Sequence, residues 1–169
     1  MNTKSLQYKD KQTKVKGHYK LEAYLGDIEK DADGNILNER ALIPEWGTHT
    51  YEGDNLVVTV GKQMILDRLF GLSAVGAMTR LGVGTSGTAA AVGDTALTGG
   101  VFVAFDSTPV RTSLTVAAIA TFGTATANIT WAEMGADNGT ILLARIAPIG
   151  PFTKTSAVSI VVTYSLTQS

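Results

Sequence analysis

Apolar and polar side chains alternate over residues 14–25, which is the pattern of a β-strand with one buried face. An Asp-Gly-Asn run at 33–35 follows, and Gly and Asn tolerate the positive φ angles that tight turns require. Residues 36–42 are therefore predicted to return as the second strand of a hairpin. The stretch 44–54, which begins with proline, is predicted to be a loop.

The hydrophobic period changes after a short β-branched strand at 55–60. Apolar residues then recur at helical spacing, with charged and amide side chains between them, so residues 62–70 are predicted to form one short amphipathic helix. Gly71 is predicted to end it. The apolar residues in this pattern are Met64, Ile65, Leu69 and Leu72.

The remainder of the chain predicts short strands separated by turns and by a loop of small residues at 84–100. Asn138-Gly139 is the strongest hairpin signal, because both residues suit a two-residue turn. Strands without long helices between them predict a mainly β fold, an antiparallel β-sandwich or barrel-like domain. The predicted strands are 100–105, 109–119, 125–134, 140–147 and 157–166.

Charged residues are distributed unevenly along the 169-residue chain. Residues 1–54 hold 8 of the 14 basic and 10 of the 15 acidic residues. Residues 1–13 are polar and without periodicity, so we expect an extended N-terminal arm that a partner orders. Residues 14–169 are then a single β-rich domain, with a charged hairpin and loop over 14–54 and a core over 55–169.

Composition excludes several kinds of site. The chain has no cysteine, so disulfides, thiolate zinc sites, iron–sulfur clusters and cysteine nucleophiles are ruled out. Basic and acidic residues nearly balance, which argues against direct nucleic-acid binding. The apolar runs are too short for a membrane span, and the lysine-rich N-terminus has no apolar segment of the kind a Sec signal needs. We expect no membrane association.

Two motifs resemble parts of ligand-binding sites, but the residues around them do not complete either site. The glycines of 82–87 match the spacing G-x-G-x-x-G, but no helix opens at the last glycine, so a flexible turn is predicted instead of a nucleotide site. Asp31, Asp33 and Asn35 resemble the start of a calcium loop, but Arg40 stands where the bidentate glutamate is needed. A looser calcium site stays open as an alternative, and the prediction is no metal and no cofactor.

Catalytic chemistry has little support. His18 and His49 are the only histidines, and no zinc-protease or nucleophile-elbow motif accompanies them. A triad assembled from distant positions is not excluded by spacing, so a hydrolase built on a carboxylate and His49 is kept as an alternative. Glu133 and Asp137 are the best carboxylate pair, but they flank a predicted hairpin end, where charged residues are ordinary. The prediction is that the protein is not an enzyme.

The predicted binding surface combines the arm with the aromatic loop. Six lysines lie within residues 1–20 against one aspartate, and the arm has no arginine and no aromatic cluster for base stacking, so a protein partner is favoured over nucleic acid. Aromatic anchors beside polar segments are typical of interfaces. In an alternative role, a carbohydrate-binding β-sandwich, Trp131 would join the loop aromatics in stacking on sugar rings. The predicted interface residues are Tyr8, Lys9, Trp46 and Tyr51.

Longer stretches of the chain carry a family resemblance. These stretches are the run 54–62 (DNLVVTVGK) with Ile65–Leu69, Leu81–Thr85, Ala89–Ala91 and Gly93–Leu97, followed by Thr130–Gly135, Gly139–Arg145 and Lys154-Thr155. Over residues 54–166 the chain resembles small virion structural proteins of tailed bacteriophages. It departs from their pattern at Thr98-Gly99-Gly100, where an acidic residue is usual.

The resemblance implies a non-enzymatic virion component, assembled in the cytoplasm of a bacterial host and bound to major capsid or tail subunits and to copies of itself. Such proteins serve as capsid decoration, head fibres or tail fibres. Capsid decoration is favoured here because the chain is short and has no coiled-coil heptads or long fibrous repeat. A tail or fibre role is the alternative.

Removal of residues 1–13 tests the predicted arm. We expect the shortened protein to bind virions more weakly, because the arm is predicted to gain order on its neighbour, while the melting temperature stays nearly unchanged. Co-sedimentation with purified particles and a thermal melt measure the two effects. Equal occupancy of the shortened and full-length proteins would contradict the prediction.

Overall fold

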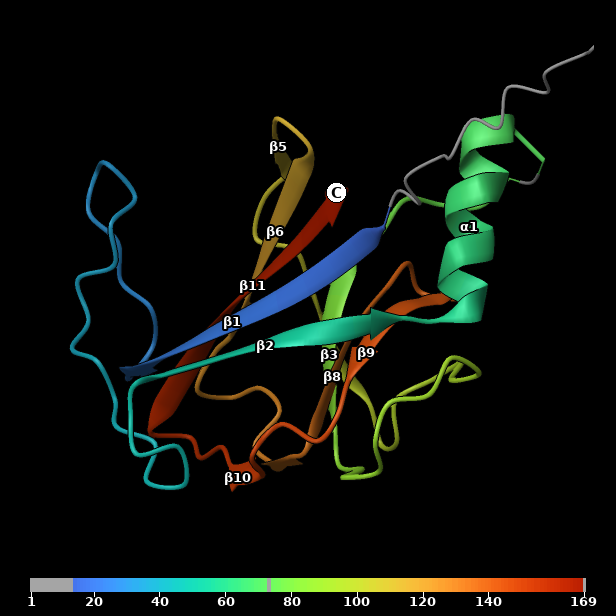
Figure 1. The fold of residues 1–169 in the computed structure, drawn as a ribbon. Coiled ribbons are helices and arrows are strands. Elements are labelled where there is room, and N and C mark those ends of the chain that lie inside the picture. Colours follow the sequence, from blue (N-terminus) through green and yellow to red (C-terminus); the bar gives the residue numbers. More distant parts are fainter. Residues whose placement is uncertain (1–13, 73, 169) are drawn as a thin grey trace, which may run out of the picture.

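β1 (Val15–Leu25) lies inside a nine-stranded antiparallel sheet, between β2 and β11. The computed structural model describes residues 14–72 and 74–168. Figure 1 shows that the sheet is strongly curled. Across it, the strands follow the order β4 (Val101–Ala104), β3 (Arg80–Gly84), β8 (Glu133–Asp137), β9 (Leu142–Ile146), β2 (Thr50–Val57), β1, β11 (Val158–Gln168), β6 (Thr115–Phe122) and β5 (Val110–Thr112).

The curl gives the sheet the form of a half-barrel. Beyond β4, the backbone N–H of Asp106 donates a 2.8 Å hydrogen bond to the carbonyl of Ile119 in β6, and the Asp106 carboxylate accepts from Thr121. These bonds bring one flank of the sheet toward the other. A separate pair, β7 (Thr130–Trp131) and β10 (Phe152–Thr153), adds to the enclosed core. The mainly β, barrel-like class with one helix is confirmed.

The core fills the space inside the curl. Trp131 packs edge-on against Phe122, with ring centroids 4.9 Å apart, and Phe152 lies 5.3 Å from the same indole. Alternating residues of β1 and β11, such as Leu21 and Val162, face each other across the register and are fully buried. The alternation over 14–25 therefore predicted both the strand and its buried face.

The predicted second hairpin strand at 36–42 is wrong. That segment makes only isolated bridges, Lys30 with Ile36 and Tyr24 with Arg40. Most of β1 already has β2 and β11 as its two neighbours, so a further full strand has nowhere to pair. The true partner, β2, begins at Thr50 and so occupies part of the predicted loop.

Two other predicted strands are each interrupted. The stretch 109–119 becomes β5 and β6 because Ser113 takes a left-handed φ of 54° between them. The stretch 125–134 becomes β7 and the start of β8. The Asn138-Gly139 hairpin is confirmed: Gly139 has φ 96°, and the Asn138 side-chain oxygen accepts from the N–H groups of Thr140 and Ile141.

The helix α1 (Thr59–Phe70) begins three residues before the predicted start at 62. Gly71 ends it with a left-handed φ of 62°, as the sequence predicts. The first turn lies directly on β9, where the carbonyl of Leu143 accepts from the N–H of Val58. A side chain at Gly61 would overlap that carbonyl, so glycine is what allows the helix to approach the sheet so closely.

Substitution of Gly61 tests this contact. Alanine in place of glycine ordinarily stabilises a helix by about 1 kcal/mol. Here we expect Gly61→Ala to lose about 1–3 kcal/mol of unfolding free energy, because the new methyl group overlaps backbone that has little room to move. Urea unfolding measures the change. The exposed Gln63→Ala in the same helix is the control and should lose nothing; a stabilised Gly61→Ala would contradict the close approach.

Candidate interaction surface

An apolar groove lies where the inner face of the sheet extends beyond the hydrophobic core. Along this face the row of Tyr19 and Tyr164 is buried, with ring centroids 4.8 Å apart. Burial raises the pKa of both hydroxyls. The next row outward pairs Gly17 with Leu166, and Leu166 with Val116 of β6. Val116 is 38% exposed, so the inner face of the sheet leaves the core here.

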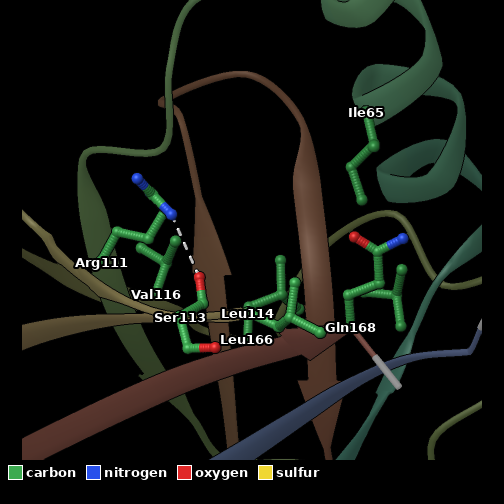
Figure 2. Close-up of a pocket in the computed structure, with 8 residues that line it drawn as sticks. Ile65, Arg111, Ser113, Leu114, Val116, Leu166 and Gln168 are labelled. Carbon is green, nitrogen blue, oxygen red and sulfur yellow. Dashed lines mark hydrogen bonds between the residues drawn. The ribbon is translucent and has the colours of Figure 1, made fainter.

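Side chains from the helix and the strands line the groove. Figure 2 shows Ile65 pointing from α1 toward Leu166 and Gln168, with Leu114 and Val116 from the β5–β6 hairpin on the strand side. The hollow has a volume of about 400 Å³. A neighbouring hollow shares Val15, Ile65 and Gln168 and extends along the helix to Met64, Arg68 and Leu69. We call these two hollows together the groove.

The apolar side of α1 is largely open to solvent beside the groove. Within the helix only Gly61 and Met64 are buried. The predicted amphipathic pattern therefore identifies the helix, but residues 14–72 and 74–168 leave much of its apolar side uncovered. The exposed fractions are 52% for Leu66, 73% for Leu69, 69% for Phe70 and 72% for Leu72.

The rim of the groove is basic. Arg111 lies at the strand side, where its guanidinium donates a 3.2 Å hydrogen bond to the Ser113 carbonyl (Figure 2). Arg68 lies at the helix side. Lys16 and Lys62 line a shallow hollow next to Val15. The surface therefore combines an apolar floor with cationic edges, which suits a partner that presents apolar side chains flanked by carboxylates.

Two of the predicted interface residues, Trp46 and Tyr51, do not lie in the groove. Trp46 is half-buried, 4.4 Å from Phe152 between ring centroids, and its indole N–H donates to the Gly150 carbonyl. Tyr51 packs against it at 5.6 Å. Both side chains pack on the hydrophobic core. Tyr8 and Lys9 fall outside the described residues.

The aromatic platform required for sugar stacking is incomplete. Trp131 is fully buried, and its indole N–H donates to the Ala127 carbonyl. Only Trp46 and Tyr51 of the three aromatics keep any exposed surface. No local pattern separates Trp131 from the other two, because its burial depends on β7 pairing with β10, a distant segment of the chain.

A cluster of charged side chains lies inside the protein, and the sequence analysis did not predict it. Glu133 has no exposed surface, and the guanidinium of Arg145 donates to it through Nε. Arg145 Nη1 also donates a 2.7 Å hydrogen bond to Asp94. The other Glu133 oxygen accepts from the N–H of Thr98 at 2.6 Å and of Ser86 at 3.3 Å. We call Glu133, Arg145 and Asp94 the buried triad.

Hydrogen bonds within the buried triad favour the charged forms of Arg145 and of Asp94, whose side chain is 24% exposed. The Ala91 N–H, and then the Arg145 guanidinium, hold the pKa of Asp94 below its usual value. Burial alone would lower the pKa of Arg145, but its hydrogen bonds to Asp94 and Glu133 raise it. With each carboxylate bonded to this arginine and to backbone N–H groups, the arrangement fastens the loop 85–100 to the sheet.

Glu133 and Asp137 therefore do not form a paired acid and base. Asp137 accepts two hydrogen bonds from the Arg80 guanidinium, at 2.9 and 2.7 Å. Glu133 accepts instead from the Arg145 guanidinium. Both carboxylates lie on the hairpin strand β8, and each is buried. A signal was present: Arg145 stands within the otherwise apolar strand Leu142–Ile146, where a charge needs a buried partner.

The glycine motif and the acidic turn are structural. Gly82 and Gly84 lie in β3, so the predicted flexible turn is wrong there; a side chain at Gly82 would overlap the Phe102 ring. The Asp31 carboxylate accepts from the N–H groups of Asp33 and Asn35, so it is used within its own turn. Within residues 14–72 and 74–168, no cluster of three or more His, Asp or Glu side chains is placed to bind a metal.

Neither histidine lines the groove. His18 hydrogen-bonds Asp54 at 3.0 Å on the exposed face of β1 and β2. His49 is exposed just before β2 and makes no ion pair with a carboxylate in the described part of the chain. None of the described helices is both long and apolar enough to cross a membrane.

Comparison with protein-family models, with curated proteins and with solved structures gives no match to this chain. The groove is therefore interpreted from its own geometry and charge.

Variants of the buried triad test its structural role. We expect Arg145→Met to lose about 3–5 kcal/mol of unfolding free energy, because it leaves Glu133 charged and without its cation inside the protein. Glu133→Gln removes that charge, while its amide oxygen still accepts from Thr98 and Ser86. The double variant should therefore be more stable than Arg145→Met alone. Urea unfolding at neutral pH measures both, and a double variant no more stable than Arg145→Met would contradict the prediction.

Proposed function

We propose that this protein is a non-enzymatic structural component of a tailed-bacteriophage virion, which binds the capsid surface as a decoration protein. The observation that carries the proposal is the uncovered apolar side of α1 next to the groove. Contiguous apolar surface of this kind marks protein–protein interaction sites on soluble proteins. A tail or fibre location would use the same surface and is the alternative.

The groove supplies binding energy at low entropic cost. Complete burial of one exposed Leu or Phe side chain contributes about 1.5–3 kcal/mol. Leu69 and Phe70 lie at the end of a helix that Gly61 seats on the sheet, so little backbone order has to be gained on binding. Many copies on a repeating capsid lattice would add their contacts through effective concentration. Adhesion of this kind needs no deep pocket.

The residues that carry the phage resemblance support the proposal. Asp94, Glu133 and Arg145 lie within its matched runs and form the buried triad. Lys154 is also buried, and its ammonium donates to the carbonyl of Gly123 and the side chain of Asn128. The shared pattern therefore consists of residues that fix loops onto a sheet, which is what a scaffold requires and a catalytic site does not.

Binding to purified virions tests the proposal. The probe is a phage that encodes the chain, with its own copy of the gene deleted, mixed with purified protein. We expect the wild-type protein to co-sediment with the particles and cryo-electron microscopy to locate it on the head. The double variant Leu69→Ser with Leu114→Ser should bind about 100-fold more weakly, because two apolar contacts are lost.

Val110→Ser is the matched control, since Val110 is 64% exposed and does not line the groove. It should bind as the wild type does. Absence of the wild-type protein from the particles would overturn the virion role. Normal binding by the groove variant would overturn the groove as the binding surface.

A further inference from the structure

The loop 26–49 carries a surface opposite in charge to the groove rim. It contains six acidic residues and two basic ones. Two large apolar side chains on it are exposed, Leu37 at 61% and Leu42 at 57%. We call this loop the acidic tip. Its exposed acidic residues are Asp27, Glu29, Asp33, Glu39 and Glu45.

The acidic tip is held in shape by its own hydrogen bonds. Asn38 is the central brace: its side-chain oxygen accepts from the Glu29 N–H at 2.7 Å, and its amide donates to the carbonyls of Leu25 and Asp27 at 2.8 Å. The Asp31 carboxylate closes the turn at the end. Residues 26–38 of the tip are therefore preformed, and binding through them requires little ordering.

The acidic tip and the groove lie at opposite ends of the same strand. β1 starts at Val15, which lines the groove, and ends at Leu25, next to the tip. Figure 1 shows α1 at one side of the molecule and the loop 26–49 at the other. At about 3.3 Å per residue, the strand separates them by roughly 33 Å. The tip of a molecule therefore does not reach its own groove.

We propose that the acidic tip of one copy docks in the groove of a second copy. Leu37 and Leu42 meet the apolar floor formed by Leu69 and Leu114, and the tip carboxylates meet the cationic rim. The rim residues are Lys16, Lys62, Arg68 and Arg111. This proposal rests on the adhesive role of the groove and names a second copy of the chain as its occupant; in an open assembly the groove of the end copy stays free to bind the virion.

The geometry of such a contact is head-to-tail. Each copy offers one tip and one groove, so the two surfaces in contact are different, and a bound pair leaves one tip and one groove free. Contacts of this type continue into a closed ring when the rotation between copies returns to its start, and into a chain when it does not. A symmetric dimer, in which the same patch meets itself, is not expected.

Sedimentation of the purified full chain, without particles, tests the proposal. We expect the wild type to form species larger than a dimer as its concentration rises, and to dissociate at high salt because the charges are screened. A tip variant, Leu37→Ser with Leu42→Ser, and the groove variant, Leu69→Ser with Leu114→Ser, should each be monomeric. All four side chains are exposed, so the fold should be kept, and thermal melts check this.

Mixing the two variants gives the decisive result. The tip variant keeps a working groove and the groove variant keeps a working tip, so the mixture should form a 1:1 dimer that does not grow further. A wild type that stays monomeric, variants that still associate, or a mixture that stays monomeric would each overturn the head-to-tail contact. Co-sedimentation with virions is measured separately, so failure of self-association leaves the proposed virion role to its own test.

Discussion

The salt bridges of Arg145 to Glu133 and Asp94 hold the loop 85–100, a long segment without helix or strand, against the curled sheet. That loop in turn supports the helix. The N–H of Thr59, the first residue of α1, donates a 2.8 Å hydrogen bond to the carbonyl of Val92 in the loop. The position of α1, and with it one wall of the groove, therefore depends on a charge cluster far from the groove itself.

The loop also covers a small apolar cluster. Leu97 packs with Val58, just before the helix, and with Leu142 of β9. A segment rich in Ala, Gly and Thr supplies few large side chains to hold itself in place, so one leucine and the buried triad do most of the anchoring. Removal of a charged partner would leave an uncompensated charge in the interior, which is far more costly than losing a surface salt bridge.

The sequence was sufficient for what depends on local pattern. Alternation identified β1 with its buried face, Asn138-Gly139 identified a hairpin, and the spacing around Met64 identified the helix. Each of these signals lies within one segment. The mainly β, barrel-like class followed from the same local signals.

The sequence was insufficient wherever distant segments decide the outcome. Residues 36–42 look like a strand, but β11, more than a hundred residues away along the chain, takes the second side of β1. Glu133 looks like an exposed hairpin residue until Arg145 and the loop 85–100 cover it. The groove could not be foreseen because the helical pattern predicts an apolar side without saying whether the same chain buries it.

The brevity of the two edge strands limits how copies of this protein can associate. β5 has three residues and β4 has four, and the chain beyond β4 bends toward β6 through Asp106. Long, flat edges invite further strands to add by backbone hydrogen bonding, and that route leads toward amyloid-like growth. Because these edges are so short, copies of the protein can associate only through contacts between side chains. An assembly of these subunits should therefore dissociate when it is diluted.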